Sequence, residues 1–195
     1  IVDNKVKNFQ GKLDKVYNSI CRVLDLPEQG TFVKKFLLSD WHHENIPNDA
    51  KKTSESFEET ITYLRTSIVD GKEIRSYLKK RVSSLGNIYL SLTKRQMSQS
   101  ESHRIELFTK LDAKVYESLL LQKDEDRQII HRKTTQILFE DNQYFVEKYT
   151  DFALVRVNHF EGEDISLPSW FGASTDVTED EKYFSYNLSN PNFKL

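Results

Sequence analysis

The basic residues between positions 72 and 95 are the strongest candidates for binding chemistry in this sequence. The segment carries a charge of about +6, with Glu73 as its only acid, in a chain of 195 residues whose net charge is −2. Lys and Arg side chains attract phosphates and anionic lipid headgroups, each contributing on the order of 1 kcal/mol near a charged membrane. The candidate lipid- or phosphate-binding residues are Lys72, Arg75, Lys79, Lys80, Arg81, Lys94 and Arg95. The alternative is a solvated basic face that pairs with acidic helices such as 123–126.

Aromatic residues near the C-terminus are candidates for binding a partner protein. They surround an acidic stretch at 176–181, and exposed aromatic side chains are common anchors at protein interfaces. The candidates are Trp170, Phe171, Tyr183, Phe184 and Tyr186. The alternative is that these rings cover an apolar strip of the same chain.

No arrangement of residues indicates a catalytic or metal site. The string Trp41-His42-His43-Glu44 comes nearest, but adjacent histidines point to different sides of an element and rarely share one ion. Cys21, the single cysteine, is expected to be a buried structural thiol. Glycine-rich phosphate loops, nucleophile elbows and zinc-binding helix motifs do not occur. We therefore expect no metal, no cofactor and no catalysis, and an enzyme built from scattered residues is the least favoured hypothesis.

Composition limits the class of protein. With only 6 glycines and 4 prolines, the chain has few residues for the many turns of an all-β fold. The net charge gives no reason to expect nucleic-acid binding, and no apolar run is long enough to span a membrane. A single cysteine suits a reducing compartment. We expect a cytoplasmic protein, or one peripheral to a membrane, and a start at Ile1 suggests a fragment or a processed chain.

The spacing of breaking residues indicates long helices. About 120 residues separate Pro47 from Pro168, and the absence of proline permits uninterrupted helices. A first helix is expected at 1–24, before Pro27 and Gly30. A short segment at 32–41 and a polar linker at 42–53 follow it. Two long helices are then expected, from Ser54 to about 95 and from about 102 to 157, joined by a polar connector at 97–102.

Apolar residues at steps of three and four support this interpretation. The first long helix would carry a stripe made of Phe57, Ile61, Leu64, Ile68, Ile74, Leu78, Val82, Leu85, Tyr89 and Leu92. Such steps are typical of a coiled coil, and helices of this length would extend about 60 and 80 Å. The predicted fold is all-α: an elongated antiparallel long-helix hairpin with an extra N-terminal helix. We expect a helical domain at 1–160 and an acidic aromatic tail at 161–195, docked or flexible. A short strand at Ala153–His159 is the less favoured alternative.

Part of the predicted first long helix resembles a known family. Ile68-Val69-Asp70-Gly71-Lys72, Tyr77-Leu78-Lys79-Lys80-Arg81, Tyr89 and Leu92 resemble the first core helix of the BAR and F-BAR superfamily of membrane-curving dimers. The likeness covers about residues 57–95, and Ser84 and Leu85 stand where the F-BAR pattern has an acid. The resemblance implies a crescent-shaped dimer whose basic residues face lipid.

Two functions follow from this interpretation. The first is a non-catalytic helical scaffold, a homodimer or a pair with another helical chain, with a BAR-like basic surface for anionic membranes. The second is a subunit of a larger cytoskeletal or nuclear assembly that docks partners through its helices and its aromatic tail. In the first case, replacing Leu78 and Leu85 by Asp should abolish both folding and assembly.

Overall fold

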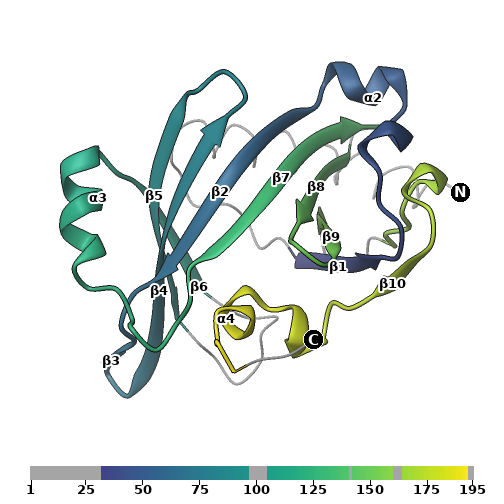
Figure 1. The fold of residues 1–195 in the computed structure, drawn as a ribbon. Coiled ribbons are helices and arrows are strands. Elements are labelled where there is room, and N and C mark those ends of the chain that lie inside the picture. The colour runs from purple at the N-terminus through teal and green to yellow at the C-terminus, as the bar shows by residue number, and fades with distance from the viewer. Residues whose placement is uncertain (1–31, 97–104, 141, 160–163, 193–195) are drawn as a thin grey trace, which may run out of the picture.

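Strands dominate the fold. The computed structural model describes residues 32–96, 105–140, 142–159 and 164–192 (Figure 1). Its strands are β1 (Phe32–Leu38), β2 (Glu55–Tyr63), β3 (Ser67–Val69), β4 (Lys72–Ser83), β5 (Ile88–Gln96), β6 (Ile105–Lys110), β7 (Ile130–Phe139), β8 (Asn142–Lys148), β9 (Ala153–His159) and β10 (Ser174–Asp176). The helices are short: α2 (Asn48–Lys52), α3 (Ala113–Leu120), α4 (Ser185–Leu188), and the 3-10 turns η1 (His43–Asn45), η3 (Ser169–Phe171) and η4 (Glu181–Tyr183).

All of these strands belong to one sheet in which every pairing is antiparallel. The strand order is β10-β1-β9-β8-β7-β2-β4-β5-β6, with β3 paired to β4 at the side. The sheet curls strongly, so that its two ends bend toward each other around a concave face (Figure 1). We call this concave side the inner face and the convex side the outer face.

The outer face holds most of the apolar core. Side chains alternate between the faces of a strand, and most of the buried apolar residues of β1, β7, β8 and β9 face outward. They form a buried cluster with the segments that follow β1 and β9: Phe36, Leu38, Ile46, Ala50, Ile137, Tyr144, Val146, Ala153, Val155, Val157 and Phe171. Residues 39–52 and 165–171 thus cover this half of the sheet.

A second apolar cluster covers the outer face of the other half. Leu78 of β4 is fully buried, and it packs with Leu64 and with Tyr116 of α3. The partly buried leucines of β5 and of α3 surround these three residues. The helix α3 begins at Asp112, whose side chain accepts a hydrogen bond of 2.9 Å from the backbone N–H of Val115, as expected for an N-cap.

The prediction of long helices is wrong, because residues 55–96 form β2 to β5 instead. Phe57 and Ile61 are four residues apart, as are Ile74, Leu78 and Val82. A step of four keeps a side chain on one face of a helix and equally on one face of a strand, whose period is two. Lys72, Ser76 and Lys80 lie on the same face of β4 as Ile74, Leu78 and Val82, so the strand lacked the regular apolar–polar alternation of a half-buried one. The absence of proline also suits central strands.

The resemblance to the BAR and F-BAR superfamily is likewise wrong. Its central residues, Asp70 and Gly71, form a tight turn between the antiparallel strands β3 and β4, with φ angles of 50° and 73°. Positive φ at both central residues is the reason for the Asp-Gly preference of two-residue hairpins. The prediction of a coiled-coil scaffold for membranes falls with the helices, since the region that carried it is sheet.

The remaining predictions have mixed outcomes. The strand alternative at Ala153–His159 is confirmed as β9. The region of the predicted third helix contains α3, but also β6, β7, β8 and part of β9. The predicted helix at 1–24, with Cys21, lies outside the described residues. The division of the chain at residue 160 stays a prediction, although β10 from the C-terminal part pairs with β1. Among the described residues, no helix is long and apolar enough to cross a membrane.

Candidate anion-binding site

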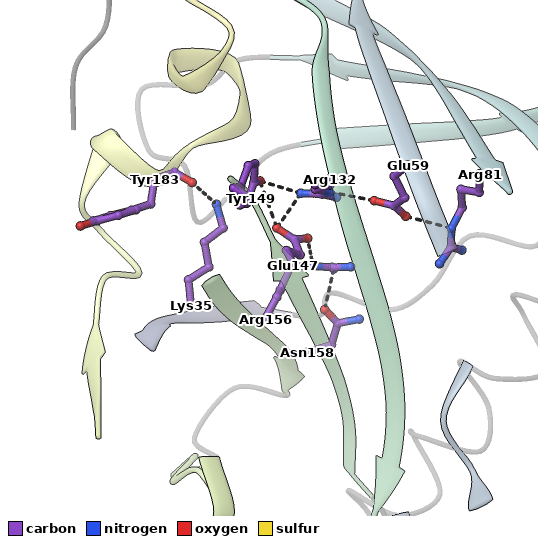
Figure 2. A network of polar contacts seen from close by, with 9 residues as sticks. All are labelled: Lys35, Glu59, Arg81, Arg132, Glu147, Tyr149, Arg156, Asn158 and Tyr183. Carbon is purple, nitrogen blue, oxygen red and sulfur yellow. Dashed lines mark hydrogen bonds and ion pairs between the residues drawn. The ribbon is translucent and has the colours of Figure 1, made fainter. Parts of the chain in front are cut away.

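A line of charged residues crosses the inner face, with one residue from each of five neighbouring strands. The order is Arg81, Glu59, Arg132, Glu147 and Arg156, from β4, β2, β7, β8 and β9, and we call this line the charge ladder (Figure 2). The strand register places Glu59 opposite both Arg81 and Arg132. The signs therefore alternate across the sheet, and both ends of the ladder are positive.

Arg132 is the centre of the ladder and contacts both carboxylates. Its Nε donates to Oε2 of Glu59 at 2.8 Å, and one terminal nitrogen lies 2.6 Å from Oε2 of Glu147. The same nitrogen donates to the hydroxyl of Tyr149 at 2.8 Å. The side chains of Arg132, Glu59 and Glu147 are 5%, 2% and 6% exposed. Buried charges need such pairing, because an unpaired ion away from water is strongly unfavourable.

The two ends of the ladder remain accessible to solvent. Nε of Arg81 lies 2.9 Å from Oε1 of Glu59, and Nε of Arg156 lies 3.5 Å from Oε1 of Glu147. Both arginine side chains are 28% exposed. Their guanidinium groups lie over aromatic rings, Arg81 over Phe57 at 4.0 Å and Arg156 over Phe145 at 4.3 Å. The rings hold the planar guanidinium groups in place on the inner face.

The electrostatics of the ladder favour fully ionised carboxylates. Burial by itself would raise the pKa of Glu59, but the charges of Arg132, Lys79 and Arg81 outweigh it and hold the pKa well below its usual range. Burial would also raise the pKa of Glu147, and Arg132 and Arg156 reverse the effect. Desolvation by burial raises the pKa of Tyr149 to about 12, so its hydroxyl stays protonated.

Two lysines add positive charge beside the ladder. Lys35 of β1 is in register with Arg156, and its Nζ donates to the backbone carbonyl of Tyr183 at 3.3 Å. Lys79 lies two residues from Arg81 on the same face of β4 and is partly buried. Five positive side chains thus accompany two carboxylates, Glu59 and Glu147, which leaves a surplus of about +3 in the middle of the inner face.

The C-terminal segment, residues 181–190, covers one end of the inner face. The ring of Tyr186 packs against Tyr63 at 5.2 Å between centroids. The guanidinium groups of Arg75 and Arg127 lie 3.9 and 3.3 Å from the centre of the same ring. A terminal nitrogen of Arg127 also donates to the backbone carbonyl of Tyr186 at 2.6 Å. The segment is therefore fixed by both stacking and hydrogen bonds.

The structure divides the predicted basic residues between the two faces. Arg75, Lys79, Arg81 and Arg95 lie on the inner face, whereas Lys72, Lys80 and Lys94 occupy the alternate, outward positions of β4 and β5. These residues were predicted to act together because they are close in the sequence. They lie on opposite faces because successive side chains of a strand point to opposite sides of the sheet.

The predicted partner-binding aromatics pack against their own chain. Phe171 is fully buried in the outer-face core, and Trp170 stacks on it at 3.9 Å between centroids. Tyr183 lies 5.9 Å from Phe152, and Phe184 lies under Lys35. Their positions agree with the alternative in which these rings cover apolar surface of the same chain. Docking of a partner stays a prediction.

The string Trp41-His42-His43-Glu44 lies in the segment that follows β1. Nε2 of His42 lies 2.8 Å from Oδ1 of Asp40, and both side chains are exposed. Trp41 packs against Trp170 and Phe171. In the part of the chain that the structure describes, no group of three His, Cys, Asp or Glu residues is placed to hold a metal ion.

Sequence reasoning missed most of the ladder. Glu59, Arg132, Glu147 and Arg156 were not singled out, and neither was Lys35 beside them. One signal was present: Arg156 interrupts the apolar run from Ala153 to Val157, and Glu147 directly follows the run from Tyr144 to Val146. A charge inside an apolar strand requires a partner, and several such charges in neighbouring strands indicate a polar face.

Comparisons with known proteins identify no family. No family model and no curated protein sequence matches the chain. Among solved structures, the PH1012 protein from Pyrococcus horikoshii OT3 is similar with a TM-score of 0.43 and 8% identity, over 68% of this chain and 80% of that one. The conserved hypothetical protein Pfu-838710-001 from Pyrococcus furiosus is similar with a TM-score of 0.42 and 10% identity, over 68% and 81% of the two chains. The sheet overturns the helical scaffold function that the sequence predicted.

Proposed function

We propose that the inner face binds an oligophosphate anion. The observation that carries this proposal is the surplus of positive side chains around the ladder, about +3, in a chain of net charge −2. A purely structural network would be expected to balance its charges, because uncompensated buried charge is unfavourable. Here the two ends of the ladder are arginines that keep more than a quarter of their side-chain surface exposed.

Arginine makes phosphate the most suitable ligand. The planar guanidinium group donates two parallel hydrogen bonds to phosphate oxygens, and these charge-assisted bonds are stronger than neutral ones. Arg81 and Arg156 are four strands apart, which is about 19 Å along the curved sheet at ordinary strand spacing. A ligand with several phosphate groups suits such a spread of charge better than a single phosphate does.

The proposal is for binding without hydrolysis, which keeps the expectation that the chain is not an enzyme. Both inner-face carboxylates are ion-paired, and the pKa of each is lowered by neighbouring arginines. Such carboxylates are poor general bases near neutral pH, because an effective base has a pKa close to the working pH. Incubation with tripolyphosphate, with and without Mg²⁺ or Mn²⁺, should release no phosphate. If the parent chain releases phosphate and the Arg132→Gln variant does not, the inner face is a catalytic site, and the proposal of binding without hydrolysis is wrong.

Isothermal titration calorimetry with inorganic phosphate, pyrophosphate and tripolyphosphate tests the binding directly. We expect the affinity to rise with the number of phosphates and to fall with added salt. Arg156→Gln should weaken tripolyphosphate binding by about 10- to 100-fold, the effect of one charged hydrogen-bonding group. The matched control is Lys133→Gln, which removes an exposed charge beside Arg132 on the outward side of β7. Equal losses in both variants, or no binding by the parent chain, would overturn the proposal.

A further inference from the structure

The strand β6 carries large apolar side chains at exposed positions. It is the last strand of the sheet, and among the described strands only β5 pairs with it. Leu107 and Phe108, at the middle of β6, are 63% and 56% exposed. They are successive residues of a strand, so they lie on opposite faces of the sheet. Soluble proteins usually protect an edge strand with charges, proline or a covering segment, because an exposed apolar edge pairs readily with another chain.

The hydrogen bonds of β6 show which of its backbone groups point away from β5. Leu111 donates its N–H to the carbonyl of Leu90 at 2.9 Å, and these two residues continue the register of β5 and β6. In an antiparallel pair, such hydrogen-bonded positions recur at every second residue. The odd-numbered residues of β6 therefore bond to β5. The even-numbered residues, with Phe108 at their centre, direct their N–H and C=O groups toward the other edge of the strand.

We propose that this edge pairs with β6 of a second copy of the chain, so that one continuous sheet runs through a twofold dimer. The proposal is independent of the anion site. A twofold axis perpendicular to the sheet places the same face of both copies on the same side, and the strands that meet at the axis are antiparallel. With the axis at Phe108, this residue lies opposite its own copy, and positions 106 and 110 lie opposite each other. Each of these pairs would exchange two backbone hydrogen bonds.

The residues of β6 are complementary to themselves in this register. Positions 106 and 110 are Glu and Lys, and opposite charges in directly opposed positions stabilise a strand pair. The two Phe108 rings would meet on one face as a cross-strand aromatic pair. On the other face, Leu107 would lie diagonally across from its own copy, within reach of a long side chain. The alternative register, centred on Leu107, would place Glu106 opposite Phe108 and lose the charge pairs.

Sedimentation velocity of the full chain across a range of concentrations tests the dimer. We expect a species of twice the 22.9 kDa of the chain, which dissociates on dilution. Phe108→Ser removes the central ring and should raise the dissociation constant of the dimer by at least about 10-fold. The matched control is Leu85→Ser, at a side chain that is 85% exposed in the turn between β4 and β5, and it should leave the constant unchanged. The circular dichroism spectra of both variants should match that of the parent chain.

Disulfide cross-linking tests the register. The background is a chain in which Cys21, its single cysteine, is replaced by Ser. Phe108→Cys should then give a disulfide-linked dimer on oxidation, because the Cα atoms of a hydrogen-bonded pair are about 5.5 Å apart, within the range of a disulfide. Leu107→Cys should not, because diagonal neighbours are about 7–8 Å apart, which is too far for a disulfide.

Three results would overturn the inference. The first is a monomer at every concentration, and slow amide exchange at Phe108 in that monomer would show that the edge is covered by the chain's own residues. The second is a dimer that Phe108→Ser and Leu85→Ser weaken equally, which would place the interface elsewhere. The third is cross-linking of Leu107→Cys as fast as that of Phe108→Cys, which would exclude the register centred on Phe108.

Discussion

The two faces of the sheet are built from the same strands but differ in what fills them. On β4, Leu78 faces outward and is fully buried against α3, whereas the next residue, Lys79, faces inward among arginines. On β7, Ile137 lies in the outer core and Arg132 at the centre of the ladder. In many sheet proteins the apolar side is the concave, enclosed one. Here the convex side is covered by α3 and by loops, and the concave side carries the charge ladder beside a smaller apolar cluster of Ile61, Tyr63 and Ile130.

This difference assigns separate roles to the two faces. Burial of apolar surface on the outer face supplies the favourable free energy of folding, at roughly 25 cal/mol per Å². Charge pairs on the inner face gain little net stability after the cost of desolvation. The arginines of the inner face therefore add little to the stability of the fold. For this reason we attribute them to the binding of a ligand.

The largest expected effect comes from removing the centre of the ladder. Arg132→Leu leaves Glu59 and Glu147 buried without their main partner, and we expect a loss of about 3–5 kcal/mol in the free energy of unfolding. The triple replacement of Glu59, Arg132 and Glu147 by leucine should be less destabilised than Arg132→Leu alone. Urea denaturation measures both. A triple variant that is less stable than the single one would mean that the inner face contributes to folding as the outer face does.

On the outer face, the free energy of unfolding should depend instead on the volume of the buried apolar side chains. Leu78→Ala removes a fully buried side chain and should cost about 2–4 kcal/mol by urea denaturation. Leu85 is 85% exposed in the turn between β4 and β5, so Leu85→Ala should change the stability by less than about 0.5 kcal/mol. The two leucines were equivalent in the helical interpretation, and a large loss from Leu85→Ala would restore it.

As the pH falls, the ion pairs of the inner face should lose their contribution to stability, whereas the apolar packing of the outer face should not. The pKa of both Glu59 and Glu147 is lowered in the folded chain from the ordinary 4.5, so the unfolded chain takes up protons first as the pH falls. Their contribution is complete above pH 4.5 and is lost below it, at about 1.4 kcal/mol per pH unit for each carboxylate. Thermal melts from pH 7 to 3 measure the loss. Glu59→Gln should melt with a shallower dependence on pH, and an unchanged dependence would contradict the assignment.

The smallest effect concerns the C-terminal segment. Tyr186→Ala removes the ring between Arg75 and Arg127, and we expect a loss of about 1–2 kcal/mol from the two cation–π contacts and the packing on Tyr63. Amide hydrogen exchange at residues 185–189 should speed up more than exchange in β7 does. Leu121→Ala, at a side chain that is 85% exposed, is the matched control. Equal acceleration throughout the sheet would show that the segment is part of the core.

Sequence analysis predicted some local features correctly, but its prediction of an all-α fold was wrong. The strand at Ala153–His159 was recognisable because Val155 and Val157 alternate with other residues and β-branched residues favour strands. The segment from Phe57 to Leu92 was misinterpreted because apolar steps of four fit both a helix and a strand. The Asp70-Gly71 hairpin signal was read as part of a helical motif. The small number of glycines was taken as evidence against an all-β fold. The turn between β3 and β4, however, contains one glycine, Gly71.

The candidate site was predictable only in part, for a physical reason. Lys79, Arg81 and Arg75 were singled out from their local density of charge. Arg132, Glu147 and Arg156 come from β7, β8 and β9, and only the strand order brings them beside Glu59. Such long-range register depends on the whole sheet, and the local pattern of residues does not encode it.

The central claim is that the inner face, and not the outer one, takes up phosphate-like anions. Crystals of the chain soaked with tungstate test it most directly, because the anomalous signal of the metal locates the anion. We predict a peak within hydrogen-bonding distance of the guanidinium groups of Arg81 or Arg156, displaced by tripolyphosphate and absent in the Arg81→Gln, Arg156→Gln double variant. A peak confined to outward lysines such as Lys80 or Lys133, with none on the inner face, would contradict the account.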